Sequence, residues 1–128
     1  MPYKYEDVDG LENHDMVGSH QCVALMQTYA AAPATSNWRQ GEAVVGNVML
    51  RKGTAVATFV NGRYPNRSHG NHAAFFLRQA LGGIYVMDQW KSKKNGKINS
   101  RFIRSQGRDK QGNFKFPSDN ADAFFVIL

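Results

Sequence analysis

The chain of 128 residues contains one cysteine, Cys22, and its thiol is the side chain best suited to chemistry. One cysteine cannot form an internal disulfide, and it supplies too few ligands for a structural zinc site. It is therefore either a small core side chain or a nucleophile. The i, i+3, i+4, i+7 spacing of an amphipathic helix face begins at this residue and is formed by Cys22, Leu25, Met26 and Tyr29.

The start of this helix favours a nucleophilic role for Cys22 over a structural one. Ser19 is a suitable N-cap residue, which would place Cys22 in the first helical turn. Free backbone N–H groups and the positive end of the helix dipole meet there, so we expect the pKa of Cys22 below its ordinary value of about 8.5. The same N–H groups can bind the oxyanion that forms when a thiolate attacks an amide carbonyl. The alternative is an inert cysteine on the apolar helix face, because free cysteines are often buried.

His72 is the second candidate, because it begins an apolar segment and a histidine among core residues needs a polar partner. By two-residue alternation, Asp88 shares one face of the next strand with Trp90 and with apolar residues. A hairpin that turns at residues 82–83 would bring His72 close to Asp88 or Trp90. The carboxylate would orient the imidazole, whose other nitrogen could take a proton from Cys22, as acyl transfer requires. The alternative is a structural histidine–aspartate pair that braces the hairpin.

Two further residues carry weaker signals for this chemistry. Gln89 could orient the histidine in place of Asp88, although alternation directs it to the other face of the strand. His20 lies two positions from Cys22 at a helix start, so we expect its side chain to point elsewhere.

Substrate contacts are expected from Gln21, His69 and Asn71, of which His69 lies in a polar loop. No spacing of carboxylates or thiols supports a metal site at His69 and His72. We therefore expect neither a metal nor another cofactor.

The formal net charge of +6 and the pI near 9.7 come mostly from a basic stretch late in the chain. Such a stretch suits a polyanion, either nucleic acid or an anionic cell-wall polymer, or it is a solvated loop region that aids solubility. The basic stretch is formed by Lys91, Lys93, Lys94, Lys97, Arg101, Arg104, Arg108 and Lys110.

Neither a membrane span nor a secretory signal is apparent. No apolar run approaches the roughly 20 residues that cross a bilayer. The first residues lack a basic segment followed by an apolar one. We therefore expect synthesis in the cytoplasm and, if the protein leaves, export by a route that reads no such signal.

One early helix followed by antiparallel strands predicts an α+β architecture in a single domain over residues 1–128. The helix should run from about residue 20 to 31, and a loop should extend over 34–41. A short apolar run at 44–50 then opens the strand region. Strands are predicted at 54–60, 72–78, 84–90, near Phe102 and at 123–128.

The helix-start Gln-Cys, the strand-start histidine followed by small and apolar residues, and the acidic residue just before tryptophan resemble the CHAP and NlpC-type cysteine amidases of bacterial cell walls. A closer similarity covers most of the chain. It is to the small BPSL-type family, which includes the third group of type VI secretion amidase effectors. This similarity is carried by GTAVATF at 53–59, NGRYP at 61–65, GNHAA at 70–74 and DQW at 88–90.

The resemblance implies a papain-like fold, with the nucleophile helix packed on an antiparallel sheet of about five to six strands. It also implies a peptidoglycan peptidase that cuts the murein stem or cross-link, the third group being associated with the diaminopimelate–D-Ala cross-link. In this reading Cys22 attacks the carbonyl, His72 is the general base and then the general acid, and Asp88 orients it.

The same resemblance implies an antibacterial toxin. It would be delivered by the type VI secretion apparatus to the periplasm of a competing Gram-negative cell. A cognate immunity protein would block the active site, and neither nucleic acid nor membrane would be a partner. The alternatives are a basic nucleic-acid-binding module, a papain-like toxin that acts on a protein, and a phage-type wall hydrolase with the same site.

Overall fold

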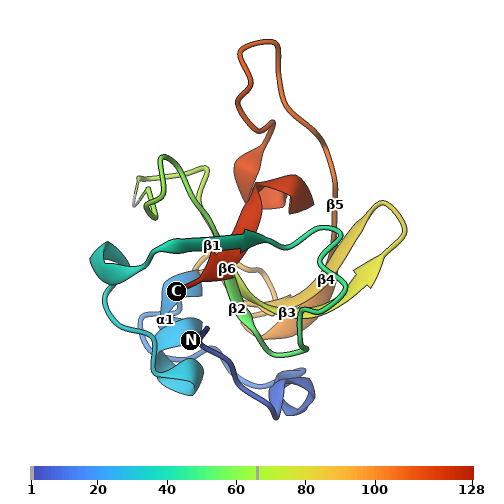
Figure 1. Cartoon of the computed structure of the whole chain (residues 1–128). Coiled ribbons are helices and arrows are strands. Elements are labelled where there is room, and N and C mark those ends of the chain that lie inside the picture. The colour runs from blue at the N-terminus through green and yellow to red at the C-terminus, as the bar shows by residue number, and fades with distance from the viewer. Residues whose placement is uncertain (1, 66) are drawn as a thin grey trace.

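The computed structural model describes residues 2–65 and 67–128, in which one α-helix packs on a six-stranded antiparallel sheet (Figure 1). This confirms the expected α+β class. No helix in these residues is long and apolar enough to cross a membrane. The elements are α1 Cys22–Ala30, β1 Gln40–Ala43, β2 Ala55–Thr58, β3 Ala73–Ala80, β4 Gly83–Asp88, β5 Asn99–Arg104 and β6 Phe124–Ile127, with short 3-10 helices at Val8–Leu11, Thr35–Asn37, Pro117–Asp119 and Ala121–Ala123.

The strand order of the sheet is β1-β6-β2-β3-β4-β5, so the last strand of the chain lies between the first and the second. Strands β3 and β4 form a hairpin in which Phe75 lies opposite Met87 and Phe76 opposite Val86. The start of β3 therefore lies beside the end of β4. Polar residues at these two strand ends meet, although their positions in the sequence are far apart.

Alternation along the strands builds a separate apolar cluster on each face of the sheet. On one face, Leu25 and Met26 of α1 are fully buried in a cluster with Phe75 of β3. The other face carries a second cluster that includes Phe76 and Phe124. Packing on both faces keeps the sheet and helix α1 fixed relative to each other.

Helix α1 begins later than expected, and the predicted N-cap residue does not cap it. Gly18 and His20 have left-handed backbone angles, with φ of 58° and 70°, so the chain turns sharply before the helix. The N-cap is Gln21, which makes no side-chain capping bond. Ser19 only accepts a hydrogen bond of 3.4 Å from the Gln21 N–H. Cys22 is consequently the first residue of the helix.

The apolar run at 44–50 forms a loop and not a strand. Strand β1 lies just before it, in a region where the sequence predicts a loop as far as residue 41. Val48 and Met49 are 85% and 84% exposed, so their apolar character does not reflect burial. Gln79 of β3 supports the loop by donating to the carbonyls of Val44 and Asn47 at 2.7 and 3.3 Å.

Candidate active site

Cys22 occupies the end of α1 where the first backbone N–H groups have no partner within the helix. Its side chain is partly buried and packs against the cluster beneath the helix. The body of α1 is anchored on β3 through apolar residues, and this leaves the helix start beside the polar ends of the sheet strands. The thiol is thus held at the boundary between the core and a surface cavity.

His72 directly precedes β3 and reaches both neighbours that the sequence suggests. Its side chain is almost fully buried, and its backbone N–H donates to Thr58 Oγ1 at 3.0 Å. The distance between His72 Nε2 and Asp88 Oδ2 is 2.7 Å. Trp90 makes an edge contact with the imidazole, with ring centroids 6.2 Å apart. Because Nε2 faces the carboxylate, Nδ1 is the ring nitrogen left for Cys22.

Asp88 has a second strong partner that the sequence analysis did not connect with the site. Arg101 of β5 donates from Nε to the same oxygen, Asp88 Oδ2, at 2.7 Å. Lys93 Nζ lies 3.8 Å from Oδ1. Burial would raise the pKa of Asp88, but the hydrogen bond and charge of His72 and the charge of Arg101 lower it. Asp88 is therefore an ionised carboxylate, although its side chain is fully buried.

The pKa values of Cys22 and His72 shift in opposite directions. Burial alone would raise the pKa of the thiol, but the hydrogen bond and charge of His72 lower it, helped by the Tyr64 hydroxyl. For His72, burial acts to lower the pKa, and it is outweighed by hydrogen bonds to Asp88 and Cys22, which raise the pKa to about 9. These directions favour a thiolate beside an imidazolium near neutral pH.

Tyr64 is the main site residue that the sequence analysis missed. Its hydroxyl lies 3.7 Å from Cys22 Sγ, and its ring packs edge-on against Trp38 with centroids 5.0 Å apart. Burial, followed by the charge of Cys22, raises the pKa of the phenol, so the phenol keeps its proton. The sequence signals for this role are an aromatic residue with a polar end in an otherwise polar loop, and the position of Tyr64 within NGRYP at 61–65, one of the segments that carry the resemblance.

Asn71 links Tyr64 to the loop that precedes His72. In the amide orientation that satisfies both ends, Nδ2 donates to the carbonyls of Arg67 and His69 at 2.9 and 3.2 Å, and Oδ1 accepts from the Tyr64 hydroxyl at 3.2 Å. The phenol has one proton, which it can donate either to this amide or to the sulfur. A charged thiolate is the stronger acceptor of the two.

Gln89 performs a different task from the one considered in the sequence analysis. It is fully buried, and its Nε2 donates to the carbonyls of Val17 and Gln21 at 3.1 and 2.8 Å. Its Oε1 accepts from the Val17 N–H at 3.0 Å. All three hydrogen bonds go to Val17 and Gln21, and none goes to His72. Gln89 therefore fixes the segment that leads into Cys22.

A cavity of about 220 Å³ opens at Cys22 and His72, and Gln21, Asn71, Tyr64 and Lys91 are among the residues that line it. Two of the three expected substrate contacts, Gln21 and Asn71, therefore face the same space as the thiol. His69 lines a neighbouring cavity of about 440 Å³, which it shares with Asn71 and His72. In the described part of the chain, no group of three or more His, Cys, Asp or Glu residues could hold a metal ion.

Comparison with known proteins identifies the family of this chain. The solved structure of type 6 secretion amidase effector 2 has the same overall fold. That structure superimposes with a TM-score of 0.92 at 45% identity, covering 99% of this chain and 94% of its own. The family model for domesticated amidase effector 2 matches residues 4–127.

Two curated relatives support the same assignment. A type VI secretion amidase effector 2 protein of Salmonella typhi is 46% identical over 132 residues, covering 99% of each chain. A domesticated amidase effector 2 of Ixodes scapularis is 34% identical over 115 residues, covering 87% of this chain and 72% of the relative. The chain therefore belongs to the domesticated amidase effector 2 family.

These findings confirm the expected type VI secretion amidase effector and the papain-like α+β fold. They correct the expected group of effectors. The resemblance indicated the third group of effectors, whereas the matching relatives carry the number two.

Proposed function

We propose that this amidase hydrolyses peptide bonds of peptidoglycan with Cys22 as the nucleophile. The observation that carries the proposal is the cavity that Cys22 and His72 line together, with His72 Nε2 2.7 Å from Asp88 Oδ2. The lowered pKa of Cys22 and the raised pKa of His72 agree with it. Membership of an amidase effector family agrees with acyl transfer as the reaction. One domain over residues 1–128 would carry the whole activity.

In the proposed reaction, the Cys22 thiolate attacks the carbonyl carbon of the scissile amide and forms a carbon–sulfur bond. The Cys22 backbone N–H would stabilise the oxyanion. His72 then gives its proton to the leaving nitrogen as the carbon–nitrogen bond breaks, which leaves an acyl-enzyme. His72 next takes a proton from water, and the resulting hydroxide attacks the thioester. The products are a carboxylate and the restored thiolate, and Asp88 keeps the imidazole oriented through both steps.

The proposed substrate is the peptide part of murein, cut in the stem or at the diaminopimelate–D-Ala cross-link, and the fragment analysis described below distinguishes the two bonds. The net charge of +6 supports an anionic substrate. The effector names of the relatives support delivery by type VI secretion, which would bring the protein to the periplasm of a target Gram-negative cell. Gln21, Asn71 and His69 would contact the peptide, because they line the cavities on either side of His72.

Digestion of purified Gram-negative sacculi tests this proposal. The wild type should release muropeptides, and Cys22→Ala should lower the rate by orders of magnitude while circular dichroism shows an unchanged fold. Mass spectrometry of the fragments identifies the bond, because cleavage of cross-links converts dimers to monomers and cleavage of stems shortens the peptides. Equal release by both proteins would contradict the proposal.

The cognate immunity protein is expected to cover the Cys22 cavity. Its addition should therefore slow alkylation of Cys22 by iodoacetamide. In the free protein, the alkylation rate should rise with pH around an apparent pKa below the ordinary thiol value, and His72→Ala should move that pKa upwards. A thiol that reacts only after unfolding would instead indicate a buried core cysteine.

A further inference from the structure

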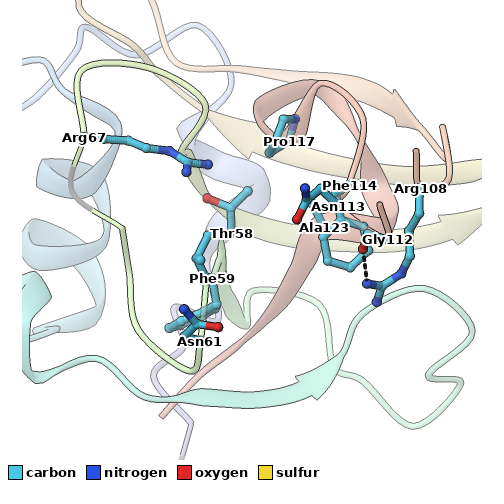
Figure 2. Close-up of a pocket in the computed structure, with 11 residues that line it drawn as sticks. Thr58, Phe59, Asn61, Arg67, Arg108, Gly112, Asn113, Phe114, Pro117 and Ala123 are labelled. Atoms are coloured by element: carbon cyan, nitrogen blue, oxygen red, sulfur yellow. Dashed lines mark hydrogen bonds between the residues drawn. The ribbon is translucent and has the colours of Figure 1, made fainter. Parts of the chain in front are cut away.

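A third cavity, of about 500 Å³, lies close to the candidate active site and has no part in the reaction described above. Its lining includes Thr58, Phe59, Asn61 and Phe114. Two arginines stand on opposite sides of this space, Arg67 on the loop before β3 and Arg108 on the hairpin after β5 (Figure 2). We call it the two-arginine cavity.

Both guanidinium groups are held in place without being neutralised. Arg67 donates from Nε to the carbonyl of His69 at 3.2 Å and from Nη2 to that of Gly70 at 3.0 Å. Arg108 donates from Nη1 to the Gly112 carbonyl at 2.8 Å, and its guanidinium lies 4.0 Å from the centre of the Phe114 ring. Within residues 2–65 and 67–128, no carboxylate forms an ion pair with either group. The cavity therefore presents two positioned, uncompensated positive charges.

The two-arginine cavity adjoins the site of chemistry. Arg67 lines both this cavity and the one that contains Cys22. Thr58 lines the two-arginine cavity, and its Oγ1 accepts the backbone N–H of His72. The two cavities therefore meet at Arg67, within reach of a peptide chain bound at Cys22.

We propose that the two-arginine cavity is a subsite for a free carboxylate of the murein peptide, away from the bond that is cut. The inference rests on the proposed function. Murein peptides carry carboxylates on their side chains and at their ends, and guanidinium groups bind carboxylates through paired hydrogen bonds. Phe59 and Phe114 supply apolar surface for the aliphatic carbons beside such a carboxylate. The subsite would therefore select the acid form of the peptide over its amidated form.

The experiment compares two soluble cross-linked muropeptides that differ only in whether the stem carboxylates are free or amidated. The wild type should hydrolyse the free acid with a kcat/KM about tenfold higher, a ratio typical of one charge-assisted hydrogen bond. Arg108→Gln and Arg67→Gln should each reduce this preference towards one, mainly by raising KM for the acid. The Cys22→Ala protein provides an independent readout, because calorimetric binding of the acid should weaken when Arg108→Gln is added.

Lys110→Gln is the matched control, since it removes the same charge from the same hairpin without lining the cavity. Lys110→Gln should retain the full preference for the acid. Arg108→Lys, which keeps the positive charge, should retain part of it. A wild type that hydrolyses both muropeptides equally, or a Lys110→Gln protein that loses the preference as fully as Arg108→Gln, would overturn the subsite alone. A wild type that releases nothing from sacculi would overturn the proposed function and the subsite with it.

Discussion

Asp88 Oδ2 lies 2.7 Å from both His72 Nε2 and Arg101 Nε. A carboxylate with two charged donors on one oxygen stays ionised although it is buried, and it restricts the imidazole to one orientation. Asp88 also contributes to the raised pKa of His72. A histidine that stays protonated up to about pH 9 can give a proton to a leaving amine at neutral pH.

Replacement of Asp88 by asparagine should therefore affect the rate and its pH dependence together. The side chain keeps its size but no longer fixes the imidazole or raises its pKa, so kcat should fall by about 100-fold or more. If the imidazolium is required, activity is lost as pH rises through the pKa of His72. Because the substitution lowers that pKa, the basic limb of the pH–rate profile should move to lower pH.

Asp119→Asn is the matched control for Asp88→Asn. Asp119 also contacts Arg101, at 3.3 Å, but it is exposed and does not touch His72. In Asp119→Asn, the basic limb of the pH–rate profile should stay where it is in the wild type. If the basic limb also stays in place in Asp88→Asn, an orienting role for Asp88 is excluded.

At the scale of elements, the site depends on how the chain enters α1 and leaves β4. The entry segment has two left-handed residues and no side-chain cap, and one local backbone bond, from the His20 N–H to the Val17 carbonyl at 3.0 Å, closes its turn. Gln89 adds a further constraint through three hydrogen bonds to Val17 and Gln21. A buried glutamine just after the last residue of β4 thus helps to determine where the thiol of Cys22 lies.

Gln89→Ala should lower the stability and misplace the thiol. It removes three hydrogen bonds to backbone groups of Val17 and Gln21, which should cost about 2–4 kcal/mol of unfolding free energy in urea titrations. The rate of Cys22 alkylation at pH 7 should also change, because the thiol is no longer held beside His72. Gln27→Ala, on the exposed side of α1, should change neither quantity beyond about 0.5 kcal/mol. An unchanged alkylation rate in a destabilised Gln89→Ala protein would restrict Gln89 to a structural role.

The strands from β2 to β6 and the His72–Asp88 pairing could be predicted from the sequence, because alternation and a glycine-rich turn are local signals. The contacts of Tyr64 and Arg101 in the site could not be predicted, since only the tertiary fold brings these two residues to it. The N-cap prediction at Ser19 was wrong because the left-handed turn at Gly18 and His20 delays the helix. Strand β1 was missed because its four residues are mostly exposed and lack an apolar pattern.

Across the whole molecule, part of the basic stretch is neutralised within the fold. Lys97 pairs with Asp15, and Arg101 pairs with Asp88 and Asp119. These pairs neutralise cations that a nucleic-acid-binding module would need. Of the cations in the stretch without an ion pair among the described residues, Lys91 lies beside the Cys22 cavity and Arg108 lines the two-arginine cavity, whereas Lys94, Arg104 and Lys110 are exposed to solvent. The charge beside the cavities suits an anionic substrate.

The buried histidine should also make the stability of the molecule depend on pH. In Cys22→Ala, the hydrogen bond and charge of Asp88 still act against burial, and we expect them to hold the folded pKa of His72 above its unfolded value of about 6.5. The folded state then binds more protons than the unfolded state above that pH. The stabilising contribution is complete below about pH 6.5 and is lost as pH rises through the folded pKa.

Urea titrations between pH 6 and 9 should show the unfolding free energy falling in Cys22→Ala and falling less in Cys22→Ala/His72→Gln. A rise with pH in Cys22→Ala would contradict this assignment.

Asp88 and Gln89 are adjacent, yet the first binds His72 and the second binds the backbone beside Cys22. The two groups of the proposed reaction are thus both held by one short stretch of chain. When the sheet flexes, Cys22 and His72 should move together, so the distance between the sulfur and the imidazole should vary less than the position of either group. The alignment of the two side chains is thus expected to withstand thermal motion of the sheet and of α1.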